Sequence, residues 1–533
     1  MLMHLLSYLI FVPLLTALLA LFIPARLTHS FRLLTLAANI LQVAILFFVF
    51  DRYSFQGGYQ LIEKLPWISI ELGSWGNLQA EYFVALDGLS FPLVALSVCI
   101  LLIATISSWT IDKNHKGYFI LLLILNTAIV GSFCALDFLL FYVFFEFMLL
   151  PMYFLIGIWG GPRREYASIK FFLYTLLGSI FILVVIIGLY LSVKTPESGE
   201  RLVHTFNVLH MQDTGNLIRG ASLALDSTYS LGSFSLRHWA FLLIVIGFLI
   251  KLPAVPFHTW LPDAHVEAPT PISVILAALL LKFGGYGLLR FAYPIFPDGA
   301  VHFGWLIGLM GLVSIIYGAL NALASKDLKR LIAYSSVSHM GFVLLGIASA
   351  TVEGITGAIY QMVSHGIISA MLFILAGVLY DRTNDRLIEN YSGLAGKMKS
   401  YTGFVLIAFF ASMGLPGLAG FMGEVMIFFG AFRSQEINGL VPSWMAITAT
   451  LGLLLSAGYY LWTIQRMFYG KYAAKNSSIE LSDINRREYI MLLPLAIGAI
   501  LFGVLPQLLL NYINPFSTKF IETWVSFENF IKP

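Results

Sequence analysis

The sequence has few charged residues and almost no cysteine. Asp, Glu, Lys and Arg make up 11% of the 533 residues, whereas a soluble domain carries about 25%. The two cysteines, Cys99 and Cys134, form no CxxC motif, which excludes a disulfide framework and a cysteine-ligated iron–sulfur cluster. The net charge is only +3 and no dense basic run occurs, so a nucleic-acid partner is not expected.

Motifs for common catalytic chemistries are also missing. There is no Walker loop, no GxGxxG after a predicted strand and no nucleophile elbow. His258 and His265 suggest a metal, but no carboxylate or cysteine completes a ligand spacing, so we predict no metal site. Asp263 is expected to cap or line a loop at the inner face. The chain therefore shows no means of carrying out redox chemistry itself.

Long apolar runs dominate the sequence, which is 59% hydrophobic. Runs near 20 residues suffice to cross a bilayer. The first run lacks a basic n-region and a small-residue cleavage site, so we expect a retained span rather than a signal peptide. The pattern predicts an all-α polytopic membrane protein with about fourteen spans, at 5–23, 31–50, 83–109, 118–135, 137–158, 168–193, 238–257, 271–293, 303–323, 328–349, 353–379, 401–432, 444–468 and 488–510.

The segments between the spans have distinct compositions. Residues 51–82 are rich in Gly and aromatic residues and alternate in polarity, which predicts short surface strands. Residues 194–237 read as a polar external connection, and 511–533 as an interfacial tail. With the N-terminus outside, the inner loops hold roughly twice as many Lys and Arg residues as the outer loops, so the positive-inside rule places both termini on the outer face.

Lys251 ends one apolar run and is followed by Pro253 and Pro256. Each proline removes a backbone donor, so the seventh span should be a broken helix. A lysine at a bilayer centre costs roughly 2.5–3.5 kcal/mol even on a lenient scale. The alternative is a lysine that snorkels to the interface. Because more ionisable residues follow within later spans, we interpret Lys251 as part of a functional site.

A second break occurs at Leu415-Pro416-Gly417 in the twelfth span. It lies five spans after the first, and an odd offset reverses orientation in the membrane. Asp137-Phe-Leu-Leu and Asp327-Leu-Lys-Arg330 echo each other more weakly. Paired broken helices in inverted halves indicate the binding or ion site of a transporter.

Six of the ionisable residues within the predicted spans stand out as a candidate site. Glu146 has only apolar neighbours in the sequence, and Lys251 is its natural partner in a pair that could open and close. Polar stripes follow two helical faces, Ser335, Ser338, His339 and Phe342 on one and Gln361, Ser364, His365 and Ser369 on the other. Hydrogen bonding between packed helices would also explain these stripes. We interpret the set as a buried proton path formed by Glu146, Lys251, Lys282, His339, His365 and Glu424.

Several motifs carry a family resemblance: Trp260-Leu-Pro-Asp-Ala-His265, Ala268-Pro-Thr270, Arg330-Leu-Ile-Ala-Tyr-Ser-Ser-Val-Ser-His-Met-Gly341 and Gly420-Phe-Met-Gly-Glu424. Over nearly its whole length the sequence resembles the chain-M family of proton-pumping NADH:quinone oxidoreductase, respiratory complex I, whose mitochondrial counterpart is subunit four. Chains L and N and the Mrp cation/proton antiporter subunits share the fold. Glu424 favours chain M, because L and N typically have lysine there. His265 and the lack of a long lateral helix also argue against chain L.

The resemblance implies one antiporter-like domain over 1–533. It comprises two inverted five-helix repeats, at about 118–293 and 303–468, with flanking helices in 1–110 and 488–533. It implies a half-channel around Glu146, Lys251 and Lys282, joined through His339 and His365 to an exit near Glu424. It implies no cofactor in this chain, since NAD, FMN and iron–sulfur clusters belong to the peripheral arm and quinone to other subunits. The implied partners are the L- and N-type chains and the lipid of a bacterial inner membrane.

Two other function classes stay open at this point. One is an Mrp-type cation/proton antiporter subunit, and the other is a scaffold that moves no protons and only holds neighbouring subunits. Charges at several depths argue against the scaffold. The sequence does not name the quinone, the pumped ion, the source organism or the electron donor, and a photosynthetic relative that takes electrons from ferredoxin would look similar.

Overall fold

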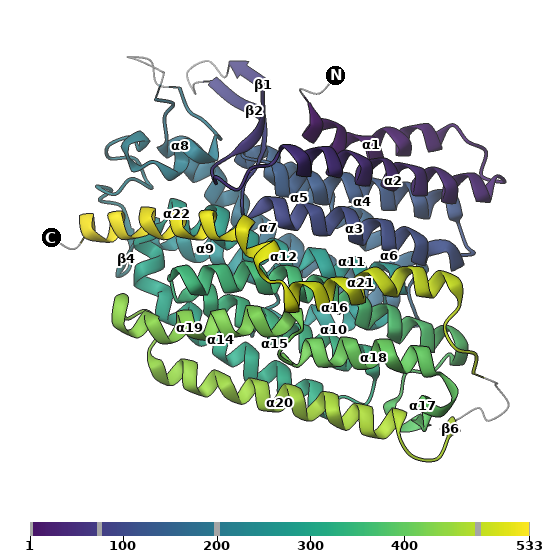
Figure 1. Cartoon of the computed structure of the whole chain (residues 1–533). Helices are drawn as coiled ribbons and strands as arrows, with labels where there is room; N and C mark the ends of the chain where they lie inside the picture. The colour runs from purple at the N-terminus through teal and green to yellow at the C-terminus, as the bar shows by residue number, and fades with distance from the viewer. Residues whose placement is uncertain (1–3, 72–76, 197–202, 475–480, 532–533) are drawn as a thin grey trace.

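The computed structural model describes residues 4–71, 77–196, 203–474 and 481–531. Its helices run roughly parallel, with α1 and α2 along one edge and α20 along the opposite edge (Figure 1). A hairpin of β1 (Gln60–Glu71) and β2 (Asn77–Leu86) projects from one end of the bundle and confirms the predicted strands. Two shorter pairs also occur, β3 (Ser230–Leu231) with β4 (Phe234–Ser235) and β5 (Tyr391–Ser392) with β6 (Ala473–Ala474).

Among the described residues, 11 helical segments are long and apolar enough to cross a membrane, and α1 (Leu5–Leu21) is a shorter apolar helix. The predicted all-α polytopic class is confirmed, whereas the number of spans stays a prediction. The 11 segments are α2 (Thr28–Arg52), α3 (Ser90–Ser107) with η2 (Ser108–Thr110), α4 (His115–Cys134), α5 (Phe138–Phe147) with α6 (Leu149–Trp159), α7 (Arg164–Ser192), the chain of α11 (Thr270–Ile275), η4 (Leu276–Leu280), α12 (Lys282–Gly287), η5 (Leu288–Ala292) and α13 (Tyr293–Ile295), then α14 (Pro297–Ala324), α15 (Leu328–Ala348), α16 (Val352–Thr383), α20 (Ser443–Phe468) and α21 (Arg486–Val504).

The helices predicted to break do so. The run 238–257 becomes α9 (Leu236–Lys251), a turn region and α10 (Trp260–Glu267), and the run 401–432 becomes α18 (Lys399–Ser412) and α19 (Ala419–Ile437). Both breaks start with the same pair of backbone hydrogen bonds. At the first break the Leu252 N–H donates to the Phe248 carbonyl, four residues earlier, and the Ala254 N–H donates to the Leu249 carbonyl, five residues earlier. At the second break Met413 donates to Phe409 and Leu415 donates to Phe410 with the same two offsets. This likeness supports the paired breaks, while the inverted repeats stay a prediction.

Asp263 does not lie in a loop, so that expectation is wrong. It belongs to helix α10, which resumes directly after the break because Pro262 falls in its first turn, where no backbone donor is needed. Its carboxylate lies 2.7 Å from Lys170 Nζ and 4.0 Å from the Arg330 guanidinium. Asp263 therefore ties α10 to α7 and α15.

The two weakly similar aspartates play the same local role. The Asp137 side chain accepts a hydrogen bond from the Leu140 N–H at the start of α5, and the Asp327 side chain accepts one from the Arg330 N–H at the start of α15. An aspartate in this position satisfies one of the free donors of the first helical turn. The remaining short helices are α8 (Val208–Gln212), η3 (Thr214–Asn216), η6 (Ile388–Asn390) and α17 (Leu394–Lys397), and the tail forms α22 (Gln507–Ile531).

A very close approach joins α16 to α19 in the second half of the chain. A Cβ added at Gly357 would lie 2.6 Å from the Ile427 backbone nitrogen, and one added at Gly423 would meet the Gln361 side chain. Small residues at helix contacts let membrane helices approach this closely. The approach places Glu424, the next residue of α19, against α15 and α16.

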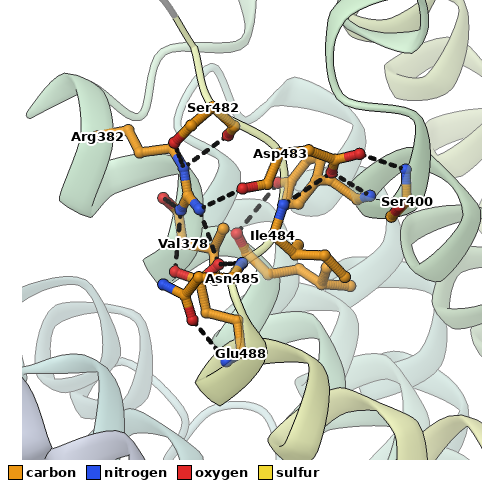
Figure 2. A network of polar contacts seen from close by, with 10 residues as sticks. Val378, Arg382, Ser400, Ser482, Asp483, Ile484, Asn485 and Glu488 are labelled. Atoms are coloured by element: carbon orange, nitrogen blue, oxygen red, sulfur yellow. Dashed lines mark hydrogen bonds and ion pairs between the residues drawn. The ribbon is translucent and has the colours of Figure 1, made fainter.

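Segment 481–488, which leads into the first turn of α21, is fastened to the ends of α16 and α18 (Figure 2). Arg382 donates to both carboxylate oxygens of Glu488, at 3.1 and 2.7 Å, and to the carbonyls of Val378, Ser482 and Asp483. The Asp483 carboxylate accepts hydrogen bonds from the backbone N–H groups of Ser400, Tyr401 and Ile484. We call these contacts the Arg382 latch.

Candidate functional site

Lys251 is the last residue of α9, and its side chain is 3% exposed. Its Nζ atom lies 4.6 Å from the centre of the Phe145 ring and 6.0 Å from that of Phe171. Within the described residues it forms no ion pair with a carboxylate. An aromatic face, which attracts cations electrostatically, is thus the immediate surrounding of this ammonium group.

Glu146 stands next to Phe145 near the end of α5 and is partly exposed. Its Oε1 atom is buried and has no hydrogen-bond partner. Pro151 lacks the N–H that would bond the Phe147 carbonyl, which accounts for the separation of α5 from α6 just beyond Glu146. Lys251 contacts the Phe145 ring and Glu146 is the next residue of α5, but the structure does not close the expected Glu146–Lys251 ion pair.

Lys282 is fully buried between the two halves of the chain. Its Nζ atom lies 2.5 Å from the Ala277 carbonyl oxygen and 2.7 Å from His365 Nδ1. The helix that carries Lys282 has π-helical turns on both sides, η4 and η5, and such turns are frequent at functional sites. This direct contact joins Lys282 to His365 of α16, in the second half of the chain.

The contacts continue from His365 through His339 to Glu424. The two imidazole rings are 5.5 Å apart between centres, and His339 Nδ1 lies 3.4 Å from Glu424 Oε1. Glu424 is 3% exposed. The order along the chain of contacts is Lys282, His365, His339 and Glu424, so four of the six predicted residues form one continuous buried series.

Sequence reasoning missed two hydroxyl groups at this series. Ser412 Oγ lies 3.1 Å from His339 Nε2, and the Tyr460 hydroxyl lies 2.7 Å from Ser412 Oγ and 2.9 Å from Ser335 Oγ. Ser412 ends α18 just as Lys251 ends α9, and this position relative to the break is the signal that could have found it. In contrast, Ser338 donates to the Ile315 carbonyl, which fits the alternative of hydrogen bonding between helices.

Three other buried ionisable groups form no hydrogen bond with this series among the described residues. Arg290, within the predicted span 271–293, is buried in η5 and pairs with Asp87 at 2.6 Å. Lys329, at the start of the predicted span 328–349, is buried and donates to the Ala268 carbonyl at 3.1 Å. His265 stacks on an aromatic ring, and both of its ring nitrogens are buried without a partner. Arg290 and Lys329 are held in the interior by polar contacts with other segments of the chain, Arg290 with Asp87 and Lys329 with the Ala268 carbonyl.

The pattern of the NADH:quinone oxidoreductase/Mrp antiporter transmembrane family matches residues 135–450, which include all six relay residues. The chain belongs to this family. A member from Rhodobacter capsulatus, NADH-quinone oxidoreductase subunit M, is 40% identical over 88% of this chain and 85% of its own length. A Synechococcus elongatus member, NAD(P)H-quinone oxidoreductase chain 4, is 39% identical over 94% of this chain and 89% of its own.

Solved structures of family members have the same fold. A chain of respiratory complex I from Thermus thermophilus matches with a TM-score of 0.81 and 29% identity, covering 97% of this chain and 99% of its own length. A chain of the Mrp complex from a Dietzia species matches with a TM-score of 0.80 at 19% identity, covering 98% of each chain. At that identity, the second match establishes the fold alone.

Proposed function

We propose that this chain is a proton-translocating membrane subunit of NADH:quinone oxidoreductase, respiratory complex I. The observation that carries the proposal is the buried series Lys282, His365, His339 and Glu424 in a chain similar to subunit M over most of its length. A structural role alone would not require four buried ionisable groups that contact one another in series. The similarity to the Mrp chain is lower at a comparable fold match, so complex I is favoured.

The proposed mechanism starts at Glu146 and Lys251. Closing or opening this pair changes the field at Lys282, since two unit charges 4 Å apart interact by about 4 kcal/mol at an effective dielectric of 20. Four kcal/mol corresponds to roughly a thousandfold change in proton affinity. Lys282 then passes its proton to His365, with which it shares a 2.7 Å contact. His365 passes a proton on to His339, whose ring centre is 5.5 Å away, and His339 delivers one to Glu424.

The finer assignments are part of the same proposal. The neighbours would be the L- and N-type antiporter-like chains, in a bacterial inner membrane with both termini on the outer face. The chain itself would bind no redox cofactor, since its two cysteines form no cluster motif, Cys134 is buried, and the described residues contain no group of three or more His, Cys, Asp or Glu able to hold a metal ion. NAD, FMN, iron–sulfur clusters and quinone would be held by the rest of the complex.

The test is substitution in the assembled complex in native membranes. Lys251→Ala and Glu146→Ala should each abolish NADH-driven proton pumping while leaving NADH oxidation by artificial acceptors intact. Lys326→Ala is the matched control, because Lys326 is an exposed lysine outside the relay. Normal pumping in both relay variants would refute the mechanism.

The composition of the complex that co-purifies with the chain tests the assignment to complex I. Flavin- and iron–sulfur-containing partners with NADH:quinone activity would support it. A small assembly without redox centres, active in cation/proton exchange, would instead establish an Mrp-type antiporter. Redox partners that accept electrons from ferredoxin rather than NADH would place the chain in a photosynthetic relative.

A further inference from the structure

Phe145 lies where it can act on the Glu146–Lys251 pair. Lys251 Nζ is 4.6 Å from the Phe145 ring centre, within the range of a cation–π contact. Glu146, the next residue of α5, has a buried carboxylate oxygen with no hydrogen-bond partner, so it is not paired with this lysine. Consecutive residues of a helix point in directions about 100° apart, so the Phe145 ring and the Glu146 carboxylate leave α5 in different directions from adjacent positions.

The Phe145 ring is held in place by neighbouring aromatic rings, independently of Lys251. It is fully buried and contacts Phe141 at 5.3 Å between ring centres, Phe248 at 6.3 Å and Phe283 at 6.1 Å. Phe248 and Phe283 meet it edge-on, at interplanar angles of 78° and 80°. Edge-on neighbours hold an aromatic ring in a defined orientation, so the face presented to Lys251 is preorganised.

In the proposed function the Glu146–Lys251 pair must open during each pumping cycle, and the inference rests on that function. Once the pair opens, a buried ammonium without a partner would be costly. We propose that Phe145 is a positioning residue whose ring face holds the Lys251 ammonium in the open state, and so sets how easily the pair opens. A desolvated cation–π contact favours its state by about 30-fold.

The test replaces Phe145 with mono-, di- and trifluorophenylalanine by amber suppression in the intact complex. Fluorine withdraws negative charge from the ring face while the ring keeps its shape. The same series at Phe141 is the matched control, because Phe141 belongs to the same ring cluster and, among the described residues, has no cation over its face. NADH oxidation by artificial acceptors reports assembly in every variant.

We expect coupled proton pumping to fall stepwise with each fluorine at Phe145, by about tenfold or more for the trifluoro form. The Phe141 series should change it less than about twofold. A structure of the trifluoro-Phe145 complex should show Lys251 Nζ paired with Glu146. Equal effects at both positions, or no trend at Phe145, would overturn the inference. A flat Phe145 series with an inactive Lys251→Ala variant refutes this inference alone, whereas normal pumping in both the Lys251→Ala and Glu146→Ala variants refutes the proposed mechanism on which it rests.

Discussion

Replacing Arg382 is expected to destabilise the Arg382 latch locally, and the structure sets the size of the free-energy cost. Arg382→Gln deletes a bidentate contact with Glu488, whose side chain is 5% exposed, and leaves that carboxylate without its cation. Breaking one side of a buried pair costs about 3–5 kcal/mol. Because the Arg382 side chain is 12% exposed and water can reach the site, the lower end applies, about 3 kcal/mol.

Segment 481–488 should therefore open more than about a hundredfold more often. The Ser400 and Tyr401 amides report this opening, because their hydrogen bonds end on the Asp483 carboxylate at 2.8 and 2.9 Å. Burial raises the pKa of Asp483, but hydrogen bonds from the backbone N–H groups of Ser400, Tyr401 and Ile484 outweigh it and hold the pKa below its ordinary value. At neutral pH the acceptor is therefore ionised and these bonds are charge-assisted.

Hydrogen–deuterium exchange with mass spectrometry measures the effect on peptides that cover 399–404 and 481–490. Arg382→Gln should speed exchange in both peptides by about two orders of magnitude. Arg433→Gln is the matched control: it removes an ion pair with Glu353 that is more exposed, which is worth at most about 1 kcal/mol. Unchanged exchange at Ser400 and Tyr401 in Arg382→Gln, or an equal change in the control, would refute the reasoning.

Two further predictions concern the relay and the helix packing around it. His365→Leu removes the acceptor that lies 2.7 Å from Lys282 Nζ. Coupled quinone reduction should therefore fall by at least about tenfold, while NADH oxidation by artificial acceptors persists. Normal pumping in this variant would exclude His365 from the path. Gly357→Ala forces α19 away from α16 at the Ile427 nitrogen and should destabilise the protein by about 1–3 kcal/mol, seen as a lower thermal unfolding temperature in detergent. Gly403→Ala, with no atom near the added Cβ, should leave that temperature unchanged or raise it slightly.

The fold class follows from composition and periodicity, because spans near 20 apolar residues are required wherever a chain crosses a bilayer. Proline chemistry located both broken helices, since a missing donor acts locally whatever surrounds it. The expectation that Asp263 caps or lines a loop failed for the opposite reason. A charged residue near a span end is solvated or buried according to which helix packs against it, and a single sequence does not contain that information.

The sequence by itself determined which residues are candidates for proton transfer, because an ionisable side chain within an apolar span is costly enough to stand out. Only the tertiary structure decided how they connect. It placed Lys282 against His365, aligned His339 with Glu424, and added Ser412 and Tyr460 through contacts between residues up to 125 positions apart. It also left Lys251 on the Phe145 ring rather than on Glu146. Spacing along a chain fixes which side chains share a helix face, whereas contact between faces depends on packing.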